Sequence, residues 1–262
     1  MIDKKVSVVI PAYRCADTIN KTIRNLDKLL KKNFNDYEII LVIDGKDRMI
    51  AKEARKAETE NLKVFHYEAN QGKGFAVKIG MNKSKGDIVG YIDGGGEINE
   101  KAVITAVKKL MEGYDIVCGS KLHSDSDVTN YTTLRKIYTR GYNLLLRILF
   151  GINYSDTQAG VKFYSRDLVK KVIPLLLVKK FAFEIEMLIV ADMLGFNKHI
   201  DIPIDIKFTP VSNAANLPAI IRMLWDTCAI FYRHRLINYY RRQEKKDNPN
   251  PRASLNIKFI EL

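Results

Sequence analysis

The stretch "GDIVGYIDGGGEINE" (residues 86–100) places an apolar run, a carboxylate, three glycines and a second carboxylate in direct succession. The apolar run at 87–92 is short and rich in β-forming residues, which predicts a buried strand. Apolar residues then recur at helical spacing between 103 and 111, which predicts a helix after the glycine loop. A strand, a loop and a helix in this order form half of a βαβ unit. Asp93 would therefore lie where a buried strand reaches the surface.

The same alternation of short apolar runs and helical segments continues through the first 120 residues. It predicts an α/β fold of the Rossmann-like kind, with a mainly parallel central sheet flanked by helices. The other predicted strands are 6–10, 38–43, 62–67 and 115–119.

Three features directly follow the ends of predicted strands. Pro11, Ala12 and Tyr13 follow the first strand, Asp44 follows the second, and Asp93 follows the fourth. In sheets of this kind, ligands bind outside the carboxyl ends of the strands. We therefore expect the three features to converge on one crevice.

Residues 121–211 have a less regular pattern, which we interpret as the second half of one domain spanning 1–211, with 1–120 as its first half. "TLRKIYTRGYNLLLRILFG" (133–151) predicts an amphipathic helix, and "GVKFYS" (160–165) predicts a strand. "FAFEIEMLIVADMLG" (181–195) predicts a helix that ends at its glycine.

The segment 212–246 combines apolar and aromatic residues with seven basic and two acidic residues from 222 onward. This predicts amphipathic helices at a membrane interface, with 144–150 as a second interfacial helix. A helix packed on the protein's own core or on a second subunit is the alternative. Residues 247–262 are expected to form an irregular extension. The side chains expected to enter the acyl boundary are Ile220, Ile221, Leu224, Trp225, Ile230 and Phe231.

The formal net charge of +13 implies an anionic partner. Nucleic acid is not expected, because the chain has no RNP, KH or helix-turn-helix signal. No run approaches 18 uncharged apolar residues and the first apolar run is too short for a secretory signal, so we expect no membrane span. The three cysteines are far apart, which predicts neither a disulfide framework nor a zinc site and favours a reducing, cytoplasmic compartment.

Two glycine-rich loops could carry chemistry. In "YIDGGGE" (91–97), the carboxylates of Asp93 and Glu97 suit a divalent cation that bridges to a diphosphate. In "NQGKGFAVKIG" (70–80), Lys73 and the backbone N–H groups at a helix start would form a phosphate cradle. This second loop is neither GxGxxG nor GxxxxGK[ST], which excludes the usual NAD and P-loop motifs. Taken alone, both loops are also compatible with tight structural turns.

Taken in order, the motifs over about residues 5–212 resemble those of family-2 glycosyltransferases with the GT-A fold. They look most like the dolichyl- or polyprenyl-phosphate hexose synthases. The most specific part is "DTQAGVKFYSRD" (156–167) together with "FAFEIE" (181–186). The other matching motifs are "SVVIPAYRCADTI" (7–19), "EIILVIDGKD" (38–47), "NQGKGFAVKIG" (70–80), "GDIVGYIDGGGE" (86–97), "VCGSKL" (117–122) and the segment 134–155.

The resemblance implies that residues 1–120 bind the nucleotide sugar. The residues it places at the base, the ribose and the diphosphate are Pro11, Ala12, Tyr13, Asp44, Lys73, Asp93 and Gly94. Asp93 and Glu97 would hold a divalent cation, Mg²⁺ or Mn²⁺. The chain departs from the family pattern at Gly95, which replaces a usual second Asp, and at Cys15, which stands where a glutamate is common.

The resemblance also implies roles in the acceptor half. Lys121 and Arg135 would join Asp93 and Glu97 in catalysis, by binding the leaving diphosphate and the acceptor phosphate. Of the two glutamates in "FAFEIE", at most one should face the site, and we favour the first. The residues on the sugar and acceptor side would be Asp156, Gln158, Gly160, Lys162 and Glu184.

The implied activity is an inverting hexosyl transfer from GDP-mannose or UDP-glucose to a polyprenyl or dolichyl phosphate. The enzyme would be cytoplasmic and peripheral at the cytosolic face of a membrane, where it meets an anionic surface. A phosphate monoester has a second pKa near ~6, so it is already an ionised nucleophile at neutral pH and needs no general base. The alternatives are a family-2 transferase with a soluble or polysaccharide acceptor, and a catalytically impaired relative that only binds sugar nucleotide.

Overall fold

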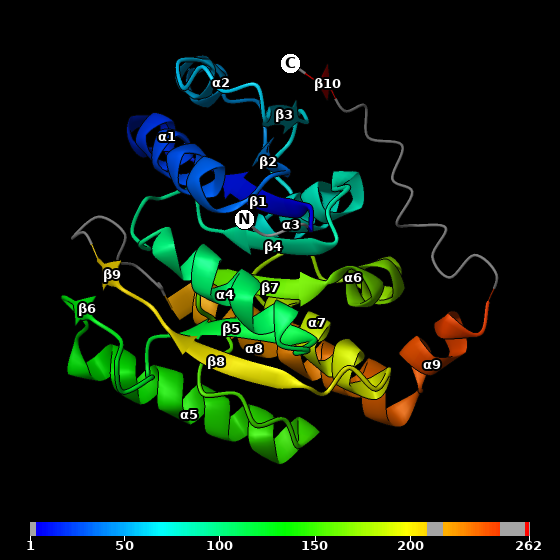
Figure 1. Cartoon of the computed structure of the whole chain (residues 1–262). Helices are drawn as coiled ribbons and strands as arrows, with labels where there is room; N and C mark the ends of the chain where they lie inside the picture. Colours follow the sequence, from blue (N-terminus) through cyan, green and yellow to red (C-terminus); the bar gives the residue numbers. More distant parts are fainter. Residues whose placement is uncertain (1–3, 209–216, 247–259, 262) are drawn as a thin grey trace.

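The computed structural model describes residues 4–208, 217–246 and 260–261. Within these residues, eight strands form one sheet in the order β10-β3-β2-β1-β4-β7-β5-β8 (Figure 1). All five strands predicted in the first 120 residues are present. The strands of this sheet are β1 (Val6–Ala12), β2 (Tyr37–Ile43), β3 (Leu62–His66), β4 (Ile88–Ile92), β5 (Ile116–Ser120), β7 (Val161–Ser165), β8 (His199–Pro203) and β10 (Ile260–Glu261).

Strand β7 interrupts the parallel order of the sheet. It lies between β4 and β5 and runs antiparallel to both. The segment before it returns to the carboxyl ends of these strands, where the N–H of Asp93 donates to the carbonyl of Gly160 over 2.9 Å. Because β7 starts at this edge, it must run back across the sheet, and its first residues lie beside the end of β4.

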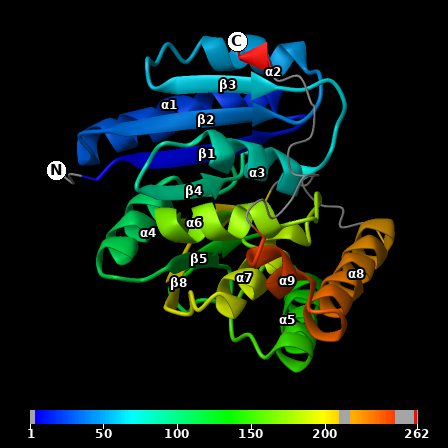
Figure 2. The same cartoon turned by 90° about the vertical axis from the view of Figure 1, so that its right-hand side faces the viewer.

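Helices cover both faces of the sheet (Figures 1 and 2). Successive strand residues point to opposite faces, so Val8 and Val9 of β1 belong to two different buried clusters. One face carries α1 (Ala16–Asn33), α2 (Arg48–Arg55) and α4 (Lys101–Met111). The other carries α3 (Lys73–Lys83), α5 (Thr133–Phe150), α6 (Arg166–Val172), the 3₁₀ turn η1 (Ile173–Leu175), α7 (Phe183–Met193), α8 (Leu217–Phe231) and α9 (Tyr239–Glu244).

A small parallel pair, β6 (Val128–Thr129) with β9 (Ile206–Lys207), lies outside the main sheet. The π-helical segment η2 (Tyr232–Leu236) links α8 to α9. The predicted boundary at 211/212 and most of the predicted extension 247–262 lie outside the described residues. Over the described ranges, no helix has the length and apolarity needed to cross a bilayer.

The C-terminal helices pack on the domain with one side. The hydroxyl groups of Tyr142 on α5 and Thr227 on α8 are 2.7 Å apart. Phe231 lies edge-on to Phe150 at a ring-centre distance of 5.9 Å, and Ile230 is fully buried. The expectation that Ile230 enters a lipid phase is therefore wrong, because Ile230 is part of the protein's own core. Phe231, which is partly buried, packs against the same core.

Candidate active site

The carboxyl edge of the sheet holds Asp93 directly after β4 and Gly160 directly before β7. A Cβ atom on Gly160 would stand 2.0 Å from Oδ2 of Asp93, closer than any real contact. The Asp93 carboxylate therefore occupies space that any larger residue at position 160 would fill. Glycine at this position is a requirement of the site.

Four charged side chains of alternating sign form a row that begins with this carboxylate. Lys73 Nζ lies 2.7 Å from Asp93 Oδ1 and 2.8 Å from Glu184 Oε1. Lys162 Nζ lies 3.2 Å from Glu184 Oε2, 3.3 Å from the Tyr91 hydroxyl and 2.6 Å from the carbonyl of Ala159. The row is neutral overall, as buried ionic groups require.

Burial decides which member of the row can meet a ligand. The side chains of Lys162 and Glu184 are 0% and 2% exposed and that of Lys73 is 16% exposed, whereas that of Asp93 is 42% exposed. Oδ1 of Asp93 is itself buried against Lys73, so Oδ2 is the oxygen that faces outward. The three inner residues support Asp93.

Neighbouring charges in the row keep Glu184 and Lys73 ionised. Burial alone would raise the pKa of Glu184, but Lys162 and Lys73 outweigh burial and keep this pKa below its usual value. Burial alone would lower the pKa of Lys73, yet Asp93 and Glu184 raise it above its usual value. Burial raises the pKa of the Tyr91 hydroxyl, which therefore stays protonated beside Lys162.

Lys73 owes its position to the loop at residues 70–72. Asp44 holds this loop: its Oδ1 accepts from the Tyr67 hydroxyl and Gln71 N, each at 2.7 Å, and its Oδ2 accepts from Asn70 Nδ2 and Gly72 N, each at 2.9 Å. Each oxygen of the Asp44 carboxylate thus accepts two hydrogen bonds from within the protein, which uses the capacity of the group. Asp44 thus sets the start of α3, and its predicted contact with the nucleotide stays a prediction.

Glu184 reaches the row from the first turn of α7, whereas Glu186 points elsewhere. Glu186 Oε2 accepts from Leu177 N at 2.9 Å and Val178 N at 2.7 Å, and its Oε1 accepts from the Tyr240 hydroxyl at 2.6 Å. One glutamate of α7 therefore serves the candidate site, and the other fastens α9.

The predicted phosphate-binding cations have partners outside the row. Lys121 Nζ contacts Oδ2 of Asp156 at 2.6 Å, and the Lys121 N–H donates to the same oxygen. Burial alone would raise the pKa of Asp156, but the Lys121 charge holds it below its usual value. Arg135 lies over the ring of Phe208, with its guanidinium carbon 4.7 Å from the ring centre. The structure thus gives each cation a partner within the protein.

The residues predicted on the sugar and acceptor side differ in exposure. Asp156, Lys162 and Glu184 are buried and Gly160 makes room for Asp93, whereas Gln158 is partly exposed. Among these predicted residues, Gln158 is therefore the one whose side chain reaches towards solvent.

The loop after β1 borders the glycines of 94–96. A Cβ on Gly94 would stand 3.1 Å from the Pro11 carbonyl oxygen and 3.5 Å from Cys15 Sγ. Ala12 is buried, whereas Tyr13 is exposed at the end of the strand. Burial raises the pKa of the Cys15 thiol to about 11, so this thiol is neutral at physiological pH.

The donor set fits a divalent cation only in part. Asp93 offers one outward oxygen, and Glu97 follows across the three glycines with a partly exposed side chain. Gly95 contributes no ligand, and over the described ranges no cluster of three or more acidic, histidine or cysteine side chains could hold a metal. Mg²⁺ commonly binds through one or two carboxylates, with water and substrate phosphates completing its shell. The residues therefore fit an ion that binds together with a diphosphate.

Sequence reasoning did not find the pairing of Lys73 with Asp93, nor the roles of Tyr91 and Tyr67. The alternation of side chains along β4 could have predicted the face of the sheet on which Tyr91 lies, because every second residue of a strand shares one face. The signal for Lys73 was its position at a helix start beside the strand ends.

Residues 7–173 match the protein family described as "Glycosyl transferase family 2". The chain is 31% identical over 205 residues to the "Dolichyl-phosphate beta-glucosyltransferase" of Dictyostelium discoideum, an alignment that covers 72% of this chain and 63% of that protein. The chain therefore spans less than two thirds of the length of this relative.

Solved structures share the fold. Glucosyl-3-phosphoglycerate synthase from Mycobacterium tuberculosis, in complex with Mn²⁺, uridine diphosphate and glucosyl-3-phosphoglycerate, has a TM-score of 0.66 at 20% identity, covering 87% of this chain and 79% of that chain. Mannosyl-3-phosphoglycerate synthase from Rubrobacter xylanophilus has a TM-score of 0.69 at 19% identity, covering 98% and 86%. The predicted GT-A fold is confirmed by these similarities, which concern the fold alone.

Proposed function

The chain belongs to glycosyl transferase family 2, and we propose that it transfers a hexose, mannose or glucose, from a nucleoside-diphosphate sugar to a polyprenyl or dolichyl phosphate. The transfer takes place at a membrane surface and inverts the anomeric centre. The observation that carries the proposal is the outward carboxylate of Asp93, which Lys73, Glu184 and Lys162 hold at the carboxyl edge of the sheet.

The position of the glycine loop supports a diphosphate donor. Gly94 approaches the carbonyl of Pro11 at the end of β1, so the loop that starts at Asp93 adjoins the segment expected to meet the base and ribose. A nucleotide along this segment would bring its diphosphate towards Asp93. Both GDP-mannose and UDP-glucose satisfy this arrangement.

We propose that Asp93 and Glu97 hold a Mg²⁺ or Mn²⁺ ion together with the donor diphosphate. When bound, such an ion offsets the negative charge that develops on the leaving diphosphate. The Mn²⁺ and uridine diphosphate in the solved complex of the mycobacterial synthase support this use of the fold. Lys73 keeps Asp93 in place and adds a fixed positive charge to the same edge.

The acceptor proposal follows from the chemistry of a phosphate monoester. At neutral pH such a group is largely ionised, with a second pKa near ~6, so the enzyme has to orient its oxygen rather than remove a proton. Lys121 and Arg135 are the proposed phosphate ligands, and partly exposed Gln158 would contact the sugar or acceptor. The name of the Dictyostelium relative, which includes dolichyl phosphate, supports a lipid-linked acceptor.

A lipid acceptor requires access to a bilayer. Ile221, Leu224 and Trp225 of α8 are exposed, with Trp225 at 76%. Such side chains on a basic segment suit the boundary between headgroups and acyl chains. We therefore propose that the protein is peripheral at the cytosolic face of a membrane.

A screen of donors against acceptors tests the proposal. Purified protein is incubated with GDP-mannose or UDP-glucose, a divalent cation and a short-chain polyprenyl phosphate, and the products are identified by mass spectrometry. We expect a polyprenyl monophosphate hexose from one donor. Transfer to 3-phosphoglycerate, with no lipid product, would instead support a soluble acceptor, the alternative suggested by the substrate names of the structural neighbours. Nucleotide binding without any transfer would support an impaired relative.

A further inference from the structure

Helix α5 presents a row of apolar side chains away from the core. Leu134, Ile137, Leu144 and Ile148 are all exposed, and Ile148 reaches 73%. Their spacing of three, seven and four residues places them on one side of the helix. The opposite side of α5 is buried in the domain through Tyr142, Leu146 and Phe150. The apolar row therefore has no covering element among the described residues.

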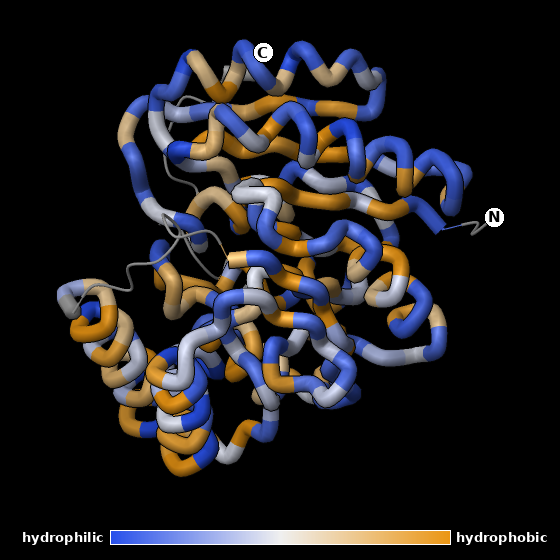
Figure 3. The backbone as a smooth tube through the Cα atoms, turned by 90° about the vertical axis from the view of Figure 1, so that its left-hand side faces the viewer, coloured by the Kyte–Doolittle hydropathy of each residue, from blue (hydrophilic) through white to orange (hydrophobic). Residues whose placement is uncertain are grey.

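Helix α8 lies beside α5, and orange segments recur along both helices in Figure 3. Helix α8 also carries exposed apolar side chains. The combined surface, called the α5–α8 face below, consists of Leu134, Ile137, Leu144, Ile148, Ile221, Leu224 and Trp225. Exposed apolar side chains in this number on two neighbouring helices favour a docking site for a membrane or a protein.

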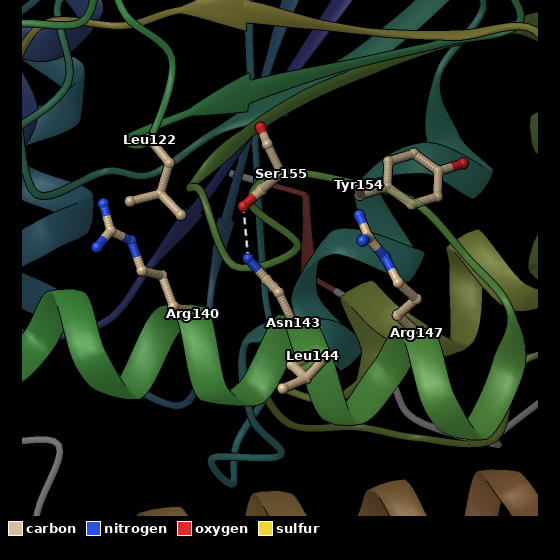
Figure 4. A pocket seen from close by; sticks show the side chains of 7 residues that line it. All are labelled: Leu122, Arg140, Asn143, Leu144, Arg147, Tyr154 and Ser155. Carbon is tan, nitrogen blue, oxygen red and sulfur yellow. Dashed lines mark hydrogen bonds between the residues drawn. The ribbon is translucent and has the colours of Figure 1, made fainter.

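A pocket of about 200 Å³ opens along one margin of this face, between α5 and residues 153–155. Figure 4 shows Arg140, Asn143 and Arg147 rising from α5 towards this segment, with Leu144 at the base. Asn143 Nδ2 donates to the carbonyl of Ser155, which fixes the back of the pocket. The remaining lining residues are Leu122 and Tyr154.

The two arginines of the pocket carry uncompensated charge. Arg147 donates to the amide oxygen of Asn153, which is neutral, and over the described ranges neither Arg140 nor Arg147 forms an ion pair with a carboxylate. Both residues are exposed. Arginine presents a planar fork of donors that matches phosphate oxygens, so two arginines beside an apolar rim suit an amphiphilic phosphate.

We propose that Arg140 and Arg147 bind the phosphate of an anionic phospholipid headgroup while the α5–α8 face contacts the acyl region. This inference rests on the proposed membrane function and adds a headgroup-binding site to the interfacial role predicted for residues 144–150 of α5. Charge argues against a second copy of the chain as the occupant. A two-fold interface would bring the same arginine-bearing margins together, and each chain carries a formal net charge of +13.

Vesicle co-sedimentation of the full chain tests the proposal. One set of vesicles is pure phosphatidylcholine, and the other contains 30% phosphatidylglycerol. The variant Arg140→Gln/Arg147→Gln is compared with Lys101→Gln/Lys108→Gln, which removes the same charge from exposed positions on α4, on the opposite face of the sheet. Each basic residue at an anionic surface contributes roughly 1 kcal/mol to binding. We therefore expect the partition coefficient of the α5 variant into anionic vesicles to fall by about tenfold or more. The α4 variant should change little because of screening.

Two controls keep the outcomes distinct. Unchanged thermal unfolding shows that the variant is folded, and unchanged transfer to a short-chain polyprenyl phosphate in detergent separates this inference from the proposed reaction. Equal partitioning of the two double variants would overturn it. Saturable binding of inorganic phosphate without preference for anionic vesicles would also overturn it, as would dimers in light scattering that disappear in the α5 variant.

Discussion

The carboxylate of Asp93 lies against Gly160, so closely that a Cβ at position 160 would be 2.0 Å from its Oδ2. This contact exists because β7 starts where β4 ends, although 67 positions separate the two residues along the chain. On its other side, the same carboxylate faces Lys73 at 2.7 Å. Asp93 is thus held between a backbone without a side chain and a fixed cation.

Gly160→Ala should displace Asp93 and lower kcat by about 100-fold, the scale expected when a reacting group moves by about 1 Å. Steady-state kinetics of hexose transfer measure this effect. Gly141→Ala is the control, because a Cβ there meets nothing within 4 Å. The control should retain activity and gain about 0.5–1 kcal/mol in unfolding free energy, since it replaces a glycine inside a helix. A Gly160→Ala enzyme with unchanged kcat would contradict the assigned contact.

Glu184→Gln should destabilise the protein by about 3–5 kcal/mol, because it leaves Lys162 buried opposite a neutral amide. The double variant Glu184→Gln/Lys162→Met removes both charges. Its loss of unfolding free energy should be about 1–3 kcal/mol smaller than the sum of the losses in the two single variants. Urea denaturation of the parent, the two single variants and the double variant gives the four unfolding free energies of this double-mutant cycle. Additive effects of the two substitutions would show that the buried pair is not coupled.

Tyr240→Phe removes a hydrogen bond to the buried carboxylate of Glu186. Bonds to charged groups are worth about 1.5–3 kcal/mol, so the unfolding free energy should fall by this amount. Tyr232→Phe removes a hydroxyl from a side chain that is 52% exposed, and it should stay within about 0.5 kcal/mol of the parent. Equal stability of the two variants would mean that Glu186 does not fasten α9.

Stability should depend on acidic pH through Glu184 and Asp156. The pKa of each is held below its usual value, 4.5 for Glu184 and 3.8 for Asp156, by neighbouring lysines. A group whose pKa is lower in the folded state stabilises the fold above its unfolded pKa and loses this contribution as pH falls through its folded pKa. Unfolding free energy measured from pH 7 to pH 3 should therefore drop below about pH 4.5. Parallel pH profiles for the parent and Glu184→Gln/Lys162→Met would rule out the Glu184 contribution.

Glu97→Gln should raise the Mn²⁺ concentration needed for half-maximal nucleoside-diphosphate binding by about tenfold or more, since a carboxylate ligand is lost. Calorimetric titration of Mn²⁺ in the presence of the diphosphate gives this value without relying on turnover. Glu100→Gln, three residues further on, is the charge-matched control. If both variants required the same Mn²⁺ concentration, Glu97 would not be a ligand.

Much of the sheet could be predicted from the sequence, because buried strands are short apolar runs bounded by turn residues. The direction of β7 could not, since it depends on where the loop before it returns to the sheet. The motifs identify Asp93 and Glu184 as candidates. Their link through Lys73 depends on three segments that are distant in the sequence and meet only in the folded structure. The sequence alone places Ile230 at the membrane, because helical periodicity shows that a face is apolar without showing what covers it.

The most direct test of the account is a crystal structure of the protein grown with Mn²⁺ and a nucleoside diphosphate, with the ion located by anomalous scattering. We predict an anomalous peak bound by Asp93 and Glu97 and shared with the diphosphate oxygens, with Lys73 still beside Asp93. A diphosphate bound elsewhere, with Asp93 in contact with neither the ion nor the nucleotide, would contradict the account.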